Sequence, residues 1–147
     1  MGDFKGEAFD VTTDGSVIVG SGSFIGSDEA FLNEAFRWTE QTGAVALGLL
    51  PGHSGYSRAK AISADGSVIV GTSADSQLNE IKAFIWDAQN GMRDLQQVLE
   101  TDFNLDLGGL TLTSASGVSA NGKIIVGRAV DANDRPRGWW VNLDQEG

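Results

Sequence analysis

The sequence predicts an all-β fold of three repeats, each with about four antiparallel strands, arranged as propeller-type blades. Three observations carry this prediction. One motif occurs three times without gaps, at residues 8–20, 59–71 and 115–127. Each copy contains an Asp-Gly or Asn-Gly pair, which is a strong local signal for a β-hairpin. Twenty glycines and only two prolines among 147 residues are typical of short strands joined by tight turns.

The repeats divide the chain at nearly regular intervals. Their central glycines, Gly15, Gly66 and Gly122, are 51 and 56 positions apart. Internal periods of this size are typical of repeat architectures, in which each unit buries its apolar face against a neighbour. We therefore expect one repeat domain over 1–147, with repeats at 7–57, 58–112 and 113–147.

Each repeat begins with a hairpin. Since Asp-Gly and Asn-Gly suit two-residue turns with positive φ at both positions, we expect Asp14, Asp65 and Asn121 at the hairpin tips. The strand after each tip is apolar at consecutive positions, as in Val17-Ile18-Val19. A strand of this kind is covered on both faces, which places it inside a stack of sheets.

An aromatic strand follows about twenty residues later, at 34–39 and 82–87, and a shorter outer strand follows at 42–48 and 90–95. Side chains alternate between the two faces of a strand, so Phe and Trp share one face in each copy. We expect four aromatic residues to lie in the core: Phe36, Trp38, Phe84 and Trp86. In the third copy, residues 137–141 keep the aromatic character but leave the register open by one residue.

A short helix is expected between repeats two and three. Leu95, Val98 and Leu99 recur at helical spacing, with Asp94 in position to cap the N-terminus and Gln97 in position to complete a capping box. The pattern predicts a helix over about 95–101.

Repeat three shows no outer strand after Asn142, and three blades are fewer than the four to eight that typically close a propeller. Exposed blade faces favour association with another chain. We therefore expect a homodimer in which two half-rings form six blades. Two alternatives stay open: a β-trefoil-like barrel, and a chain that is part of a longer array.

Composition excludes several partners. The formal net charge is −10, the acidic residues are scattered, and the ten basic residues show no dense patch in the sequence. Such a chain repels nucleic acid and anionic membranes. No apolar run approaches the roughly 20 residues of a membrane helix, so no membrane insertion is expected. Residues 1–8 lack a signal-peptide pattern, so any export signal is expected upstream.

The combined motifs resemble the HAF repeat family of probable extracellular bacterial proteins. The motifs are S-A-D-G-S-V-I-V-G, A-F-R-W-T, the G-x-x-x-L-G-x-L-P-G of 43–52, and L-T-S-A-S-G-V-S-A-N-G-K-I-I-V-G. The resemblance covers nearly the whole chain and implies a bacterial source with an extracellular or cell-surface location. It supplies no catalytic residues, and copy three departs from it at Asn121 and at Trp139-Trp140.

Two segments carry candidate site residues. The loop 51–58 gathers His53, Tyr56 and Arg58, and loops of this kind hold ligand sites in propellers. With Trp139, these residues are the predicted ligand-binding set. The oxygens of Asp131, Asn133 and Asp134 are spaced as calcium ligands are, although the segment lacks the glycine and distal Glu of an EF-hand loop. No other cofactor is expected.

These observations favour a non-catalytic extracellular or cell-surface module that presents loops to a protein or glycan. The loops are 21–33, 52–58, 74–80 and 131–137, where the copies differ while their strands agree. The alternative is a propeller-type enzyme acting on a polysaccharide, with acid and base work by loop carboxylates. The candidates for that role are Asp28, Glu29, Glu80, Asp131 and Asp134.

Overall fold

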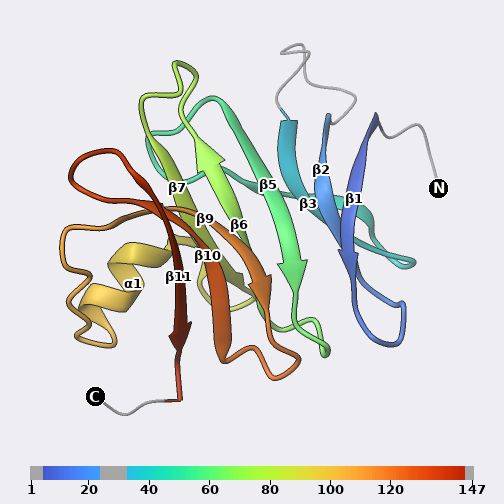
Figure 1. Cartoon of the computed structure of the whole chain (residues 1–147). Helices are drawn as coiled ribbons and strands as arrows, with labels where there is room; N and C mark the ends of the chain where they lie inside the picture. The colour runs from blue at the N-terminus through green and yellow to red at the C-terminus, as the bar shows by residue number, and fades with distance from the viewer. Residues whose placement is uncertain (1–4, 24–32, 145–147) are drawn as a thin grey trace.

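The computed structural model describes residues 5–23 and 33–144, which form three antiparallel sheets and one helix (Figure 1). We call the sheets blades one, two and three. Blade one contains β1 (Lys5–Val11), β2 (Ile18–Ser23), β3 (Asn33–Thr39) and β4 (Gly43–Gly48). Blade two contains β5 (Tyr56–Ile62), β6 (Ile69–Ala74), β7 (Ile81–Asp87) and β8 (Gly91–Asp94). Blade three contains β9 (Thr111–Val118), β10 (Ile124–Val130) and β11 (Pro136–Asn142).

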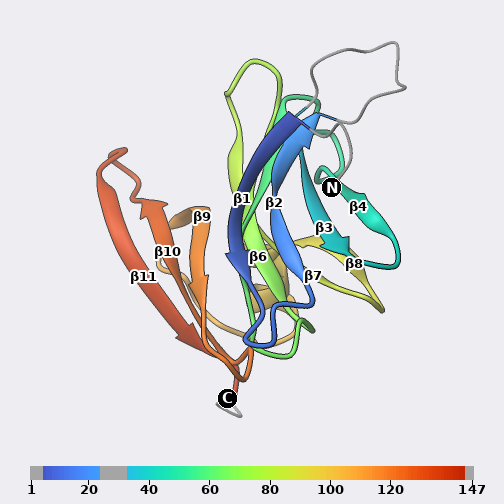
Figure 2. The same ribbon diagram turned by 90° about the vertical axis from the view of Figure 1, so that its right-hand side faces the viewer.

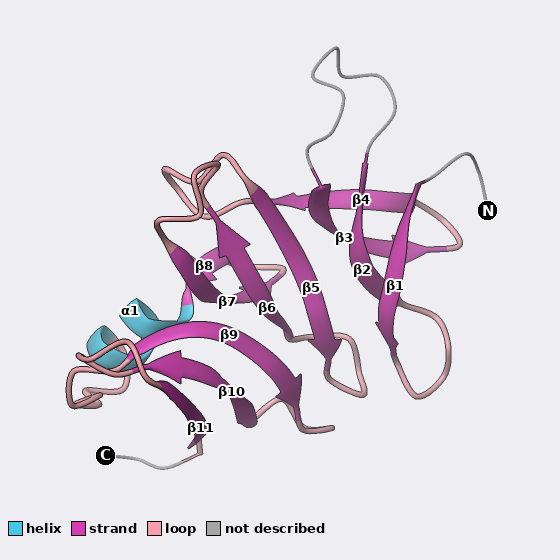
Figure 3. Cartoon of the chain, turned by 45° about the horizontal axis from the view of Figure 1, so that its top comes forward, coloured by secondary structure: helices cyan, strands magenta, loops and turns pink. Residues whose placement is uncertain are grey.

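The blades stack face to face in chain order, with blade two in the middle (Figures 1 and 3). Strand β5 contacts β1, β2 and β3 of blade one, and β9 contacts β5, β6 and β7 of blade two. Within the described ranges, strands pair only inside their own sheet. The predicted stack of antiparallel blades is confirmed, and the alternative of a trefoil-like barrel is wrong.

Two apolar cores hold the stack together, one at each junction. The core between blades one and two contains Val19, Ile69 and Phe84, and the core between blades two and three contains Val70 and Ile125. Neighbouring residues Ile69 and Val70 therefore face opposite blades, and neither is exposed. This burial on both faces explains why the second strand of each blade is apolar at consecutive positions.

The prediction that the aromatic residues of the third strands lie in the core is confirmed for phenylalanine and only in part for tryptophan. Phe36 and Phe84 are buried, with exposed fractions of 4% and 0%. Trp38 and Trp86 are half-buried, and Trp86 packs against the margin of the core between blades one and two. The larger indole ring of Trp86 reaches the edge of this junction.

Strand pairing settles the register that the sequence left open in blade three. Gly20 pairs with Phe36 and Gly71 pairs with Phe84. The third glycine of this series, Gly127, pairs with Trp139. Trp139 therefore takes the phenylalanine position, and Val141, two residues later, takes the position of Trp38 and Trp86.

The Asp-Gly hairpin tips have a different turn from the one expected. The backbone hydrogen bond from Thr12 N to Val17 O closes a loop of four residues. Of these four, only Gly15 has a positive φ, at 78°. Asp14 Oδ1 instead accepts bonds from Ser16 N and Thr12 Oγ1, each 2.9 Å long. The copies at 63–68 and 119–124 repeat this network. Asp14, Asp65 and Asn121 are exposed in these loops, as expected of tip residues.

The predicted helix is confirmed as α1 (Leu95–Thr101), with Asp94 as its cap. Asp94 Oδ1 accepts from Gln96 N at 3.0 Å and from Gln97 N at 3.4 Å. The side chain of Gln97 is exposed, whereas Gln96 ties the helix to the chain entering β9 through Leu110 O and Leu112 N. In the part of the chain that the structure describes, no helix is long and apolar enough to cross a membrane.

Candidate functional site

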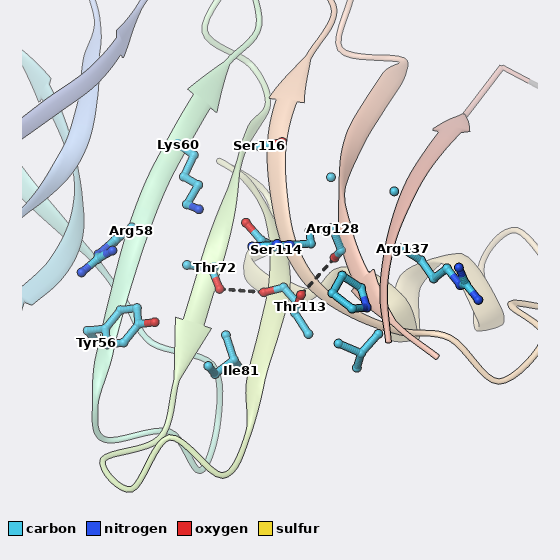
Figure 4. Close-up of a pocket in the computed structure, with 14 residues that line it drawn as sticks. Tyr56, Arg58, Lys60, Thr72, Ile81, Thr113, Ser114, Ser116, Arg128 and Arg137 are labelled. Atoms are coloured by element: carbon cyan, nitrogen blue, oxygen red, sulfur yellow. Dashed lines mark hydrogen bonds between the residues drawn. The ribbon is translucent and has the colours of Figure 1, made fainter. Parts of the chain in front are cut away.

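An open groove of about 860 Å³ is lined by residues of β5, β6 and β7 of blade two and of all three strands of blade three (Figure 4). None of the 14 residues that line it is acidic. Four are basic: Arg58, Lys60, Arg128 and Arg137. A groove lined by cations is unusual in a chain of net charge −10, which makes it the main candidate site.

Strand alternation explains why blade two supplies half of this basic cluster. Tyr56, Arg58 and Lys60 occupy alternate positions of β5 and all have some solvent exposure. The residues between them, Ser57 and Ala59, are buried at the junctions of the stack. Because neighbouring side chains of a strand point to opposite faces, burial of Ser57 and Ala59 on one face leaves Tyr56, Arg58 and Lys60 on the face that lines the groove.

Electrostatic repulsion is built into the groove. Burial lowers the pKa of Lys60 below its ordinary value, and the charges of Arg58 and Arg128 lower it further. Among the described residues, none of these three cations forms an ion pair, although Arg58 lies 4.7 Å from the centre of the Tyr56 ring. The sequence shows no dense basic patch, whereas the fold brings Arg58, Lys60 and Arg128 into the lining of one groove.

Arg137 differs from the other cations of the groove. Its guanidinium is 3.0 Å from Asp131 Oδ2, and Figure 4 shows it pointing away from Lys60 and Arg128. It therefore contributes less free positive charge to the groove than Lys60 and Arg128 do. The Arg58 guanidinium is also directed away from those two side chains (Figure 4), and Arg58 lines a second depression together with Glu7.

Hydroxyl groups line the floor between the cations. Thr72 Oγ1 donates to Thr113 O at 2.8 Å, and Thr113 Oγ1 donates to Arg128 O at 3.1 Å. Ser114 Oγ is shielded from solvent and has no hydrogen-bond partner. It lies between Lys60 on β5 and Arg128 on β10 (Figure 4). The groove thus combines charge with at least one unsatisfied hydroxyl.

The structure divides the predicted ligand-binding set. Tyr56 and Arg58 line the groove. His53 does not: its side chain is only 3% exposed, Nδ1 is 2.8 Å from Ser73 Oγ, and Nε2 is 3.5 Å from Glu80 Oε2. Because Ser73 Oγ also accepts from Leu50 N at 3.1 Å, its proton is available for Nδ1. His53 anchors the connection between blades one and two.

Trp139 also has a structural position. Its ring packs against the core between blades two and three and covers Gly127, whose Cβ, if present, would lie 2.6 Å from Cζ2. The solvent-facing indole of this pair belongs to Trp140, which is 70% exposed. Trp139 is therefore unsuited to stacking against a ligand from solvent.

The predicted calcium segment forms a turn. Asp131 Oδ1 accepts from Asn133 N at 2.8 Å and from Arg135 N at 3.0 Å, while Oδ2 pairs with Arg137. These bonds lower the pKa of Asp131, the bond from Arg135 N most strongly. In residues 5–23 and 33–144, no three His, Cys, Asp or Glu side chains lie together as metal ligands would. The geometry lends calcium no support.

Two of the carboxylates proposed for an enzyme line the same depression. Glu80 and Asp134 line a smaller depression of about 350 Å³, which shares Ile81, Thr113 and Val130 with the basic groove. Asp131 is occupied by its turn, and Asp28 and Glu29 lie outside the described residues.

Sequence reasoning missed Lys60, Arg128 and Ser114 as site residues. They come from three strands of two blades, so no local run of basic residues reveals them. A signal was present in the aligned repeats, where Arg58 and Lys60 stand opposite Glu7 and Phe9 of copy one. This difference in charge at equivalent positions of the first strand of each repeat is the signal that could have indicated the groove.

Comparison with solved structures finds a similarity to the crystal structure of TolB from Acinetobacter baumannii, with a TM-score of 0.59 and 15% sequence identity. The match covers 100% of this chain and 32% of that chain, so this chain spans about a third of the TolB chain. No family model matches, and no curated protein matches. At 15% identity the similarity concerns the fold alone. TolB has a β-propeller domain, and the three sheets are propeller-like blades.

Proposed function

We propose that the chain is a non-catalytic binding module of a bacterial extracellular or cell-surface protein, and that its basic groove binds an acidic glycan. The observation that carries the proposal is the cluster of Arg58, Lys60 and Arg128, which lack acidic partners among the described residues. When like charges lie close together in a partly buried site, each disfavours the charged form of the others. A bound anion relieves this repulsion, and perturbed titratable groups of this kind are enriched at functional sites.

The chemistry of the groove favours a carboxylate-bearing sugar among anionic ligands. Guanidinium and ammonium groups form strong charge-assisted bonds with carboxylates. The exposed hydroxyl of Ser116 adds a group that both donates and accepts, which suits a sugar ring. Nucleic acid fits less well, because the net charge of −10 repels a long phosphate backbone. The proposed location rests on the resemblance of the repeat motifs to the HAF family.

Calorimetric titration tests this proposal. The probes are oligogalacturonate, which carries a carboxylate on each sugar, and a neutral galactan oligomer of the same length. We expect binding of the acidic oligomer only, weakening as salt rises. Lys60→Met and Arg128→Gln should each lower affinity about tenfold or more, the value of a charge-assisted hydrogen bond.

Matched controls lie outside the groove. Lys123→Met and Arg135→Gln remove the same charges from exposed positions that do not line it. They should change affinity by only about twofold, through the general field. Equal binding of the neutral oligomer, or equal losses in control and groove variants, would exclude the groove as an acidic-glycan site.

A second candidate function is hydrolysis of a polysaccharide. It is favoured by one observation: Glu80 and Asp134 line a depression continuous with the basic groove. Glycosidases place two carboxyl groups on either side of the bond they cleave. Release of reducing ends from polygalacturonate by the chain, abolished in Glu80→Gln, would establish an enzyme and refute the non-catalytic proposal.

A further inference from the structure

The outer face of blade three is apolar and uncovered. Figure 2 shows this sheet at one end of the stack. Ile124, Val126 and Trp140 are exposed by 40%, 42% and 70%. The counterparts of Ile124 and Val126 in blade one are Val17 and Val19, which are covered by blade two and exposed by only 7% and 0%. Blade three therefore presents the surface on which a following blade packs.

Blade one presents the matching surface at the opposite end. Val11 is 49% exposed, whereas its counterpart in blade two, Ile62, is 5% exposed because it packs against blade one. The hairpin glycines agree. A Cβ on Gly66 would meet Thr12 and Val17 of blade one at 3.5 and 3.6 Å, but a Cβ on Gly15 would meet nothing within 4 Å.

A repeated hydrogen bond shows how the two free faces fit. At the first junction Ser21 Oγ donates to Ser57 O at 2.9 Å, and at the second Thr72 Oγ1 donates to Thr113 O at 2.8 Å. The next donor position in this series is Arg128 of blade three. The repeat alignment places the carbonyl of Gly6 in blade one at the acceptor position.

Charge complementarity distinguishes this missing junction from the two that exist. Glu7 follows Gly6 directly and is exposed, and Arg128 is also exposed. Packing blade three against a blade one would bring this guanidinium beside this carboxylate, where the existing junctions have only hydroxyl donors. The two ends of the stack thus complement each other in apolar surface, in backbone bonding and in charge.

We propose that a second copy of this chain covers both faces, with blade three of each copy packed on blade one of the other. The pairing has two-fold symmetry and two identical junctions, and its six blades fall within the four to eight that close a propeller. The pairing and the proposed function share Arg128, because this guanidinium lies beside Glu7 of the other copy in the dimer and also lines the basic groove. Trp140 and Val11 do not line the groove, so substitutions there test the pairing separately from ligand binding.

Light scattering during size-exclusion chromatography tests the pairing. The wild-type chain should elute with twice its 15.5 kDa mass. Trp140→Glu on blade three and Val11→Glu on blade one should each give a folded monomer, since these residues are already 70% and 49% exposed. Leu78→Glu, at an exposed position in the loop between β6 and β7, is the control and should stay dimeric.

A charge exchange tests the orientation. Arg128→Glu and Glu7→Arg should each weaken the dimer at least tenfold, as expected when a charge pair becomes like-charged, and the double variant should recover most of the loss. Circular dichroism checks that every variant is folded. A wild-type monomer, an open polymer, a dimer unaffected by Val11→Glu, or a double variant no better than the singles would overturn the proposal.

Discussion

One glycine in the second strand of each blade sets how closely the strands approach. A Cβ at Gly71 would overlap the carbonyl oxygen of Arg58 and lie 2.9 Å from the Phe84 ring. The register shift between Ala59 and Ala61 on the neighbouring strand, a β-bulge, lies at the same place. Glycine in a strand commonly marks a close backbone approach of this kind. Blades one and three repeat it at Gly20 and Gly127.

This packing gives a prediction for Gly71→Ala. The methyl group has no room, so the strands must separate or the Phe84 ring must move, and overpacking of this kind costs about 1–3 kcal/mol or more. Gly138→Ala is the matched control, because a Cβ there meets nothing within 4 Å, and its effect should stay within about 0.5 kcal/mol. Urea denaturation of both variants measures the difference. Equal stabilities would show that the sheet adjusts freely around this residue.

At the same scale, the repeated glycines can be read directly from the aligned repeats. Which aromatic residue lies opposite the third glycine, Gly127, cannot be read from them. A Phe-x-Trp pattern is absent from residues 137–141, and shifting a strand by one residue exchanges its faces. The pairing of Gly127 with Trp139 decides between the registers, and it depends on contacts across the sheet. Ligand roles for Trp139 could therefore not be judged from the repeat alone.

At the scale of elements, the hairpins and the helix were predictable because their signals are local. The helix begins at its expected cap, Asp94. The type of hairpin turn was not predictable from Asp14-Gly15 alone, because Thr12 and Ser16 complete the loop by bonding to Asp14. A two-residue reading omits these flanking hydroxyls.

The turn network predicts how stability responds to acid. Hydrogen bonds from Ser16, first through its side chain and then through its backbone, lower the pKa of Asp14 from 3.8 to about 2. The pKa of Asp65 is lowered by the equivalent bonds from Ser67. A carboxyl group whose pKa is depressed by folding stabilises the protein above its unfolded pKa, and the contribution is lost as pH falls through the folded pKa. The loss should occur between about pH 4 and about pH 2.

Asparagine at these tips should flatten the acid response. Asn121 makes the same bonds in copy three with an amide oxygen, so Asp14→Asn and Asp65→Asn keep the turn but remove the titration. Urea denaturation at several pH values should show a smaller loss of stability for the double variant than for wild type. Asp144→Asn, at an exposed position outside the three hairpin loops, is the control. An unchanged pH dependence in the double variant would show that other groups cause the acid response.

At the scale of the whole molecule, the order of the blades followed from the repeat, but the site did not. Arg58 and Lys60 reach the groove from blade two, and Arg128 reaches it from blade three. Their meeting depends on how two sheets stack, and a pattern within one repeat carries no information about that. Of the four predicted ligand residues, only Tyr56 and Arg58 line the groove.

The stack also predicts unequal stability along the chain. In repeat proteins each unit contacts only its neighbours, so local opening costs less at an end than in the middle. Every residue of β6 in blade two is buried, whereas every residue of β11 is exposed or half-buried. Amide hydrogen exchange should therefore be slowest in β6 and fastest in β4 and β11, which are edge strands. Uniform protection across the three blades would mean that the stack opens only as one unit.

If the ring forms, Trp140→Glu should accelerate exchange in β1 and β10, which border the proposed junction, and leave β6 nearly unchanged.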